Sequence, residues 1–301
     1  MGEFSHPAAQ SLLEKLKNAF TGTVFEKRTE FFLFVCGGPV DGKDLTLRRQ
    51  FLDWSERELP DFVVILAEDA FRQTRSQSLP RSVNLGIFEA LIAGISDFVL
   101  IFPESPGSFS EAGFFCNSPG IPKKTIIAND STYRAEESFL NLGPLRSIDS
   151  KSNFSPRIEV RVADPLDDFS VIKKKLEEWR KGARRQRFAY APYKQLGHKQ
   201  RLFVVLELLH LLRLVTLEDL RFAVKATFGP VSVDNVGRML SILVGAKYAI
   251  EIDGRYSLAK NRETMLEFDV TNKEDLIARV TEYYQRHRPE LYEAIRTWAS
   301  T

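Results

Sequence analysis

Residues 98–115, FVLIFPESPGSFSEAGFF, contain the features that decide the fold of this chain. The first five residues are all apolar, which predicts a strand buried on both faces. A turn rich in Pro, Gly and Ser follows, and the pattern then predicts a helix from about Ser108. Open α/β sheets bind their ligands where a strand passes through such a turn into a helix. We therefore expect the functional site in this stretch.

The same alternation of buried strand and helix occurs on both sides of this stretch. Further strands are predicted at residues 31–36, 62–66, 124–128 and 158–162, and helices at 45–59 and 82–94. Strands that alternate with helices imply a mostly parallel sheet with helices on both faces. The sequence therefore predicts an α/β domain, Rossmann-like or flavodoxin-like, over residues 25–168.

The rest of the chain predicts smaller, mainly helical parts. Residues 1–24 predict an N-terminal helix whose apolar stripe docks on the main domain or, alternatively, contacts a partner. Residues 169–198 predict a basic helix and linker. Three helices and a hairpin with an Asp253-Gly254 turn then follow. This order resembles a winged helix-turn-helix, so residues 199–301 are expected to form a smaller winged-helix-like domain with two C-terminal helices.

Composition indicates an ordinary globular protein of 301 residues with a net charge of +2. The two cysteines cannot form a disulfide framework, which favours a reducing, cytoplasmic location. The four histidines are far apart, and none stands at zinc-ligand spacing from a cysteine, so no metal site is predicted. No apolar run reaches the roughly 20 residues that cross a bilayer, and no secretory signal opens the chain.

Glu111 has two interpretations that do not exclude each other. The residues Ser108 to Glu111 match S-x-x-E, a capping box in which Ser108 begins the helix and Glu111 returns a hydrogen bond. Alternatively, Glu111 projects at the carboxyl edge of the sheet, where it attacks an anomeric carbon or stabilises an oxocarbenium-like transition state. The residue pattern slightly favours the cap.

Other residues at the same edge suggest a ligand pocket. The glycines in the loop Cys36-Gly37-Gly38 let backbone N–H groups approach a phosphate, or simply form a tight turn. Acidic residues form a rim that suits a hydroxyl-rich ligand such as ribose, namely Glu68, Asp69, Glu89 and Glu104. Asp97 precedes its strand and is expected to orient the backbone at the opposite edge.

The same glycine loop also matches the spacing of a Walker A motif from Gly37 to Lys43. Two residues argue against a P-loop NTPase. Asp44 stands where a hydroxyl would bind Mg²⁺, and Pro39 removes one N–H from the phosphate cradle.

A basic stretch adjoins the predicted winged helix. Phosphate contacts are expected from seven residues, namely Lys173, Lys174, Lys181, Arg184, Arg185, Arg187 and Arg238. The predicted recognition helix at 233–244 offers few polar side chains, which favours backbone binding or a protein partner over major-groove readout.

Several of these motifs together resemble a known family. They are Cys36-Gly37-Gly38, Glu68-Asp69, Glu89 eight positions before Asp97, Asn141-Leu142-Gly143-Pro144 and, above all, FPESPGSFSEAGFF. They resemble the nucleoside 2-deoxyribosyltransferase-like effectors of bacterial retrons. The resemblance covers about residues 28–150 and extends more weakly to the winged-helix region.

The resemblance implies a toxin of an antiphage, abortive-infection system. In that family a reverse transcriptase and its RNA-linked single-stranded DNA (msDNA) hold the toxin inactive until infection. The implied activity is N-glycosidic cleavage, with NAD⁺ as a substrate and no bound cofactor. Glu111 would be catalytic, and Ser105, Gly107 and Ser108 would line the pocket. Deoxyribosyltransferases have G-T-x-x-E where this chain has Gly107-Ser108-Phe109-Ser110-Glu111, which favours hydrolysis over base exchange.

Two other classes of function remain open at the level of sequence. One is a sensor that binds a nucleotide without cleaving it. The other is a transcription regulator that uses the α/β domain to bind an effector. The few polar side chains of the predicted recognition helix argue against the regulator.

Overall fold

A computed structural model of the chain describes residues 9–41, 45–76, 84–268 and 270–300. The chain forms two compact units, an α/β unit of residues 29–68 and 82–184, and a mainly helical unit of residues 1–28, 69–81 and 185–301. Gly42, Lys43 and Asp44, on which the Walker A alternative depends, lie outside the described residues, as does Ser82. Within the described parts, no helix combines the length and apolarity needed to cross a bilayer.

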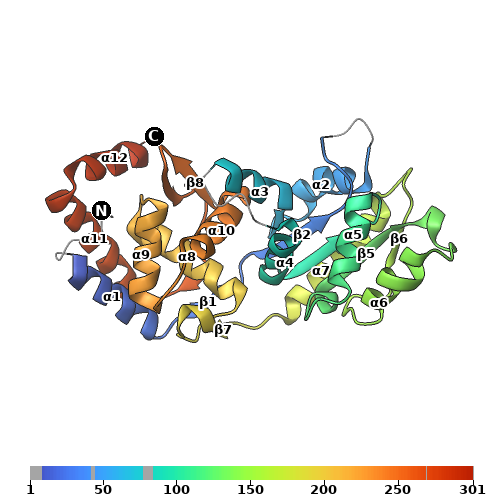
Figure 1. The fold of residues 1–301 in the computed structure, drawn as a ribbon, viewed down its shortest axis with the longest axis horizontal. Helices are drawn as coiled ribbons and strands as arrows, with labels where there is room; N and C mark the ends of the chain where they lie inside the picture. The colour runs from blue at the N-terminus through green and yellow to red at the C-terminus, as the bar shows by residue number, and fades with distance from the viewer. Residues whose placement is uncertain (1–8, 42–44, 77–83, 269, 301) are drawn as a thin grey trace. The chain divides into compact units, whose positions relative to one another are not determined.

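The α/β unit is built on a five-stranded parallel sheet with the order β3-β2-β4-β5-β6 (Figure 1). Its strands are β2 (Phe31–Cys36), β3 (Phe62–Ile65), β4 (Phe98–Ile101), β5 (Thr125–Asp130) and β6 (Ile158–Val160). Doubly wound sheets of flavodoxin type have this order, and they bind ligands at the switch point, here between β2 and β4. The predicted α/β class is confirmed.

Helices cover both faces of the sheet. The helices of the α/β unit are α2 (Leu47–Glu58), α4 (Leu85–Ile95), α5 (Pro106–Phe115), α6 (Arg146–Asp149) and α7 (Leu166–Gly182), with short turns η3 (Pro122–Lys124), η4 (Ser131–Tyr133) and η5 (Asn141–Leu145). The helix α3 (Ala67–Ser76) follows β3, and its residues from Asp69 onward belong to the helical unit. On one face, α2 and α7 bury their apolar side chains against Phe31 and Phe98. On the other, the ring of Phe115 in α5 lies 6.2 Å from that of Phe34 in β2.

The basic helix α7 is part of this core. Three of its side chains, Phe169, Ile172 and Leu176, are fully buried in the cluster beneath the sheet. Its lysines therefore project from a helix that is fixed on one side by apolar packing. At the amino edge of the sheet, Asp97 accepts a hydrogen bond from the N–H of Phe32 at 2.9 Å, which confirms its predicted role in orienting the backbone.

The helical unit surrounds a second apolar core. Its elements are α1 (Gln10–Thr21), β1 (Phe25–Glu26), β7 (Gln186–Arg187), η6 (Tyr193–Gln195), α8 (His198–Leu212), α9 (Leu217–Phe228), α10 (Val233–Gly245), β8 (Ala249–Ile252), β9 (Arg255–Leu258), β10 (Leu266–Glu267), α11 (Val270–His287) and α12 (Pro289–Ser300). The stripe of α1 packs against α9 and α11. The ring of Phe20 lies 4.9 Å from Phe228 and 5.0 Å from Phe268.

The predicted order of three helices and a hairpin is present as α8, α9, α10 and the pair β8–β9. Asp253 and Gly254 both have positive φ, at 49° and 74°, as a two-residue hairpin turn requires. Gly229 ends α9 with a φ of 86°, a conformation that favours glycine. The winged-helix assignment of this unit stays a prediction.

Candidate active site

The loops that follow β2 and β4 meet at the switch point of the sheet. The N–H of Phe102 donates to the carbonyl of Cys36 at 2.9 Å, which extends the pairing of the two strands. Beyond it, the Ser105 hydroxyl donates to the carbonyl of Gly37 at 3.3 Å. The glycine loop and the turn 103–107 are therefore one connected structure, as the sequence suggested.

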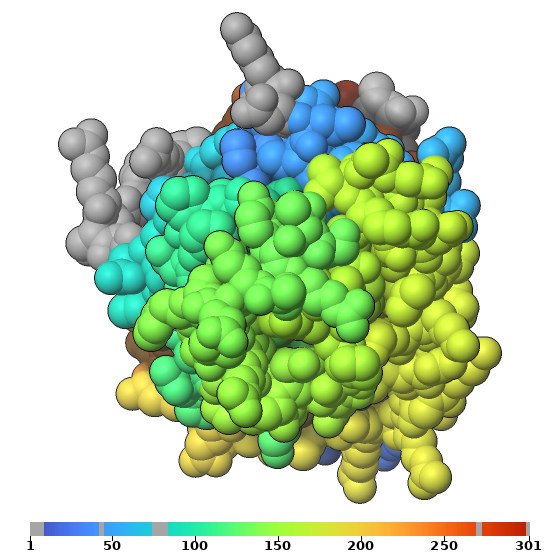
Figure 2. Space-filling view, turned by 90° about the vertical axis from the view of Figure 1, so that its right-hand side faces the viewer, coloured from blue at the N-terminus to red at the C-terminus, as the bar shows by residue number. Residues whose placement is uncertain are grey.

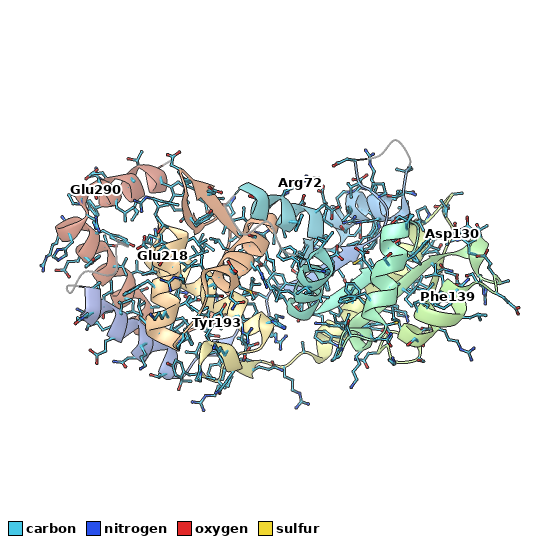
Figure 3. The ribbon with its side chains drawn as sticks, in the orientation of Figure 1. Arg72, Asp130, Phe139, Tyr193, Glu218 and Glu290 are labelled. Carbon is cyan, nitrogen blue, oxygen red and sulfur yellow. The ribbon has the colours of Figure 1, made fainter. Side chains whose placement is uncertain are left out.

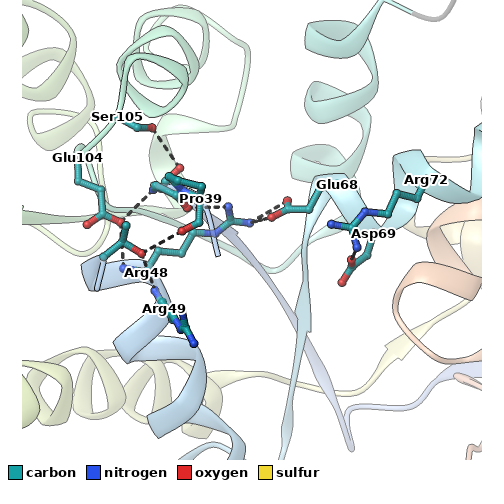
Figure 4. A network of polar contacts seen from close by, with 11 residues as sticks. Pro39, Arg48, Arg49, Glu68, Asp69, Arg72, Glu104 and Ser105 are labelled. Atoms are coloured by element: carbon teal, nitrogen blue, oxygen red, sulfur yellow. Dashed lines mark hydrogen bonds and ion pairs between the residues drawn. The ribbon is translucent and has the colours of Figure 1, made fainter. Parts of the chain in front are cut away.

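Glu104 joins this turn to the start of α2 (Figure 4). Its carboxylate accepts hydrogen bonds from the N–H groups of Gly38 at 2.9 Å, Leu47 at 2.6 Å and Arg48 at 3.0 Å. Leu47 and Arg48 are the first two residues of α2, whose N–H groups have no partner inside the helix. A negative charge is also favoured at this end of a helix dipole. Glu104 thus stabilises the fold of the loop.

The two glycines allow α2 to approach the loop. A Cβ atom on Gly37 would lie 2.7 Å from Cβ of Arg48, and one on Gly38 would lie 2.7 Å from Cγ2 of Thr46. Both distances are far below van der Waals contact. The N–H of Gly38, which the sequence assigned to a phosphate, is already bonded to Glu104.

The helix α5 begins earlier than the sequence predicts. Ser105 is its N-cap and accepts a hydrogen bond from the N–H of Ser108, while the Ser108 hydroxyl accepts one from the N–H of Ser105. Pro106 occupies the first helical position, where its fixed φ and missing N–H cost nothing. The predicted capping box of Ser108 and Glu111 is therefore wrong. Glu111 lies about one turn further into the helix and takes no part in its cap.

Glu111 instead faces the end of β2. Its side chain is largely buried, and the Cys36 thiol forms a hydrogen bond with its carboxylate. The second oxygen, Oε2, is inaccessible to solvent and has no hydrogen-bond partner among the described residues. Burying a carboxylate oxygen without a partner costs free energy. Such an atom calls for an explanation, and a catalytic role is one of those known from native proteins.

Charged side chains lie near Glu111, among them Arg48, Glu68 and Glu89. Arg48 is 6% exposed, and its Nη2 lies 2.9 Å from the Glu68 carboxylate (Figure 4). Burial and the nearby charge of Glu68 raise the pKa of Glu111, while Arg48 and Cys36 oppose that rise. Burial, Glu111 and Glu68 raise the pKa of Glu89 to about 7. Burial above all, and next Glu111, raise the pKa of the Cys36 thiol, so this thiol stays protonated and donates to Glu111.

Arg48 was missed by the sequence analysis, although the sequence contains a signal for it. The buried positions of α2 include Leu47, Phe51 and Ser55, and Arg48 falls on the same stripe at helical spacing. A basic residue on the apolar face of a helix needs a buried partner. Here the partners are the Gly38 carbonyl at 3.2 Å and Glu68.

The remaining predicted pocket residues have simpler surroundings. The hydroxyls of Ser105 and Ser108 bond to backbone groups of their own turn and of the glycine loop. Gly107 is exposed in the first turn of α5. Asp69 belongs to the helical unit and pairs with Arg72 at 3.4 Å. The structure therefore brings Cys36, Glu89 and Glu111 together with Glu68 and Arg48.

The predicted basic residues divide into paired and exposed side chains. Lys173 pairs with Glu58 at 2.9 Å, and Arg185 pairs with Glu267 at 2.8 Å. The exposed ones are Lys174, Lys181, Arg184 and Arg187. Arg238 is partly buried in α10, and its Nε has no partner among the described residues. Their contact with nucleic acid or a partner stays a prediction.

Comparison with known proteins supports the retron-effector part of the resemblance noted in the sequence, whereas its nucleoside 2-deoxyribosyltransferase-like part stays a prediction. The chain is 34% identical over 146 residues to the Escherichia coli "Retron Ec73 putative ribosyltransferase/DNA-binding protein", covering 48% of this chain and 45% of that protein. It is 33% identical over 123 residues to the corresponding Ec86 protein of Escherichia coli, covering 40% and 39%. The chain thus matches less than half the length of these relatives. The profile named "STM3845 retron effector protein" matches residues 44–251, more than two thirds of the chain. The chain belongs to this family of retron effectors.

Proposed function

We propose that this retron effector cleaves the N-glycosidic bond of NAD⁺ or a related nucleotide, with Glu111 as the catalytic carboxylate. One observation carries the proposal. Glu111 has a buried oxygen without a partner among the described residues, at the switch point where sheets of this order bind ligands. The cap role that would have explained Glu111 without catalysis belongs to Ser105 and Ser108.

The chemistry suits a buried carboxylate. As the bond between C1′ and the nicotinamide nitrogen breaks, its electron pair leaves with nicotinamide and positive charge develops on the ribose. Glu111 either stabilises that charge or attacks C1′ directly. Water then supplies the new C1′–oxygen bond and releases one proton. The ring nitrogen of NAD⁺ is already cationic, so no strong general acid is needed.

The neighbours of Glu111 support this role. The Cys36 thiol forms a hydrogen bond with the carboxylate, and Oε2 keeps its capacity to interact with a substrate because it has no hydrogen-bond partner among the described residues. Arg48 favours the ionised form of Glu111 that the reaction needs. Glu89 has a pKa of about 7 and exchanges protons near neutral pH, which suits a group that handles the proton released by water.

The comparisons support glycosyl chemistry in general terms. Both Escherichia coli relatives are named as ribosyltransferases, a class that breaks a bond at the anomeric carbon of ribose. Hydrolysis, rather than transfer to another base, is our proposal for this chain. It follows from the departure of Gly107-Ser108-Phe109-Ser110-Glu111 from the transferase pattern.

We further propose that a reverse transcriptase and its msDNA hold the effector inactive until phage infection, in an assembly of higher order. The exposed basic residues Lys174, Lys181, Arg184 and Arg187 supply cations for phosphate contacts. Charge reversal at these four positions should release the effector from the complex and leave its isolated activity unchanged. Retention of the complex in the charge-reversed chain would contradict this arrangement.

Purified chain incubated with NAD⁺ tests the catalytic proposal, with free nicotinamide followed by chromatography. We expect release by the wild-type chain and a loss of about 100-fold or more in Glu111→Gln. Glu56→Gln is the matched control, because Glu56 is an exposed glutamate on α2. Wild-type activity in Glu111→Gln would refute the assignment. Tight binding of NAD⁺ without nicotinamide release would favour the nucleotide sensor instead.

A further inference from the structure

A second concave site lies beside the candidate active site. It has a volume of about 740 Å³ and is formed by the loops after β4 and β5, by α5 and by the segment 130–144. Small-molecule sites in proteins span roughly 300–1,000 Å³. In Figure 2 the segment 125–150, in green, covers the middle of this face of the α/β unit. Residues of the stretch that carries Glu111 line this pocket, but Glu111 itself does not.

The pocket and Glu111 lie on different faces of α5. Phe109, Ser110 and Gly113 line the pocket, whereas Glu111 does not. Successive helical residues project about 100° apart, so Ser110 and Glu111 point to neighbouring sides of one helix.

Hydrogen bonds of Asn141 hold the outer wall of the pocket in place. The Asn141 amide donates to the carbonyls of Tyr133 at 3.0 Å and Glu136 at 2.9 Å. Its oxygen accepts a hydrogen bond from Arg157 at 3.1 Å. Asn141 is 7% exposed, so these bonds are protected from water. The Asn-x-Gly-Pro element found in the sequence thus holds the segment that forms this wall.

Two aromatic rings on this wall are uncovered. Phe139 is 87% exposed and Tyr133 is 52% exposed, and both line the pocket. Figure 3 shows Phe139 and Asp130 at the same end of the α/β unit. Leu45 and Val162 extend the apolar surface. A contiguous exposed apolar surface around a concavity is typical of a binding site.

The charges of the lining residues indicate which class of ligand the pocket can bind. Its lining includes the carboxylates of Glu104, Asp130 and Glu136, and the described lining residues include no Lys, Arg or His. A phosphate group would be repelled there. A flat aromatic group with N–H donors would stack on Phe139 or Tyr133 and donate hydrogen bonds to a carboxylate.

We propose that this pocket binds an adenine-type base, one that carries an exocyclic amino group. Together with the proposed function, on which this step rests, it makes the substrate a dinucleotide. The cleaved half lies at Glu111, and the adenine half lies across α5 in the pocket. A mononucleotide substrate would leave the pocket empty.

Binding of adenosine tests the proposal without any turnover. Calorimetry on Glu111→Gln should detect adenosine binding, and inosine should bind more weakly because it lacks the amino donor. Phe139→Ala in this background should weaken adenosine binding by about fivefold or more. The control is Phe114→Ala, since Phe114 is an aromatic residue of α5 that is 47% exposed and does not line the pocket.

Absence of adenosine binding, or equal losses in Phe139→Ala and Phe114→Ala, would overturn the proposal. In the chain that keeps Glu111, Phe139→Ala should raise KM for NAD⁺. KM for nicotinamide mononucleotide should stay unchanged. If Glu111 proves not to be catalytic, the binding result still stands by itself. The experiments therefore distinguish a wrong proposal about the pocket from a wrong proposal about Glu111.

Discussion

Glu104 and Glu111 are two glutamates on one strand–turn–helix segment, and their surroundings differ sharply. The Glu104 carboxylate accepts hydrogen bonds from three backbone N–H groups. Glu111 is held by one thiol and keeps a buried oxygen without a partner in the described part of the chain. A carboxylate with backbone partners stabilises the fold, whereas one without them costs stability. Mutations at the two positions should therefore affect different properties.

Replacement of Glu104 by Ala should cause the largest loss of stability in this segment. It leaves the N–H groups of Gly38, Leu47 and Arg48 without their acceptor. We expect a loss of about 3 kcal/mol in the free energy of unfolding. Urea denaturation followed by circular dichroism measures it. A change below about 0.5 kcal/mol would show that water replaces the carboxylate and that the contrast with Glu111 is weaker than the contacts suggest.

Gly38→Ala tests the same contact between Glu104, the glycine loop and the start of α2. Its expected effect on stability is smaller. The added methyl group would lie 2.7 Å from Cγ2 of Thr46 and 3.2 Å from Oε1 of Glu104. The side chain of Thr46, the N-cap of α2, must move to accept it, at a cost of about 1–3 kcal/mol. Gly113→Ala is the matched control, because a Cβ there meets no atom within 4 Å. Equal stability of the two variants in the same denaturation experiment would contradict the close approach.

Replacement of Glu89 tests the comparison through the pH dependence of stability. We expect the smallest of the three effects here. Its pKa is raised from 4.5 to about 7 by burial, Glu111 and Glu68, so the folded chain holds this proton more tightly than the unfolded chain. The resulting stability is present below pH 4.5 and is lost as pH rises through 7. Glu89→Gln should remove part of this decline.

Thermal unfolding at pH 5 and pH 8 measures the difference. The melting temperature of wild type should fall more between pH 5 and pH 8 than that of Glu89→Gln. An identical change in both chains would show that Glu89 does not carry the raised pKa. The exposed control Glu56→Gln should follow wild type.

The sequence predicted the sheet mainly because β2, β3 and β4 are uninterrupted apolar runs, whereas β5 and β6 contain polar residues and were predicted from shorter apolar segments. The hairpin was equally predictable, since Asp253 and Gly254 are residues that accept positive φ. The start of α5 was not, because Ser105 and Ser108 both fit an N-cap. Pro106 favours Ser105, because Pro is common at the first helical position, but the sequence analysis did not use this signal.

The position of the candidate site at the carboxyl edge of the sheet could be predicted from the sequence. The contacts among its side chains could not. That Glu111 lies at the carboxyl edge followed from the order of strand, turn and helix. The partners of Glu104 and the burial of Arg48 depend on how α2 meets the loops after β2 and β4, which local patterns do not encode. Tertiary contacts of this kind give Glu104 its three backbone partners and leave one oxygen of Glu111 without a hydrogen-bond partner among the described residues.

The most direct test compares Glu104→Gln and Glu111→Gln in two assays on the same preparations. The account predicts that Glu104→Gln lowers the free energy of unfolding. It predicts that Glu111→Gln is at least as stable as wild type at pH 8, because burial raises the pKa of Glu111 and disfavours its charge. Nicotinamide release from NAD⁺ should be lost in Glu111→Gln and persist in folded Glu104→Gln. The opposite pattern, with Glu111→Gln destabilised and still active, would contradict the account.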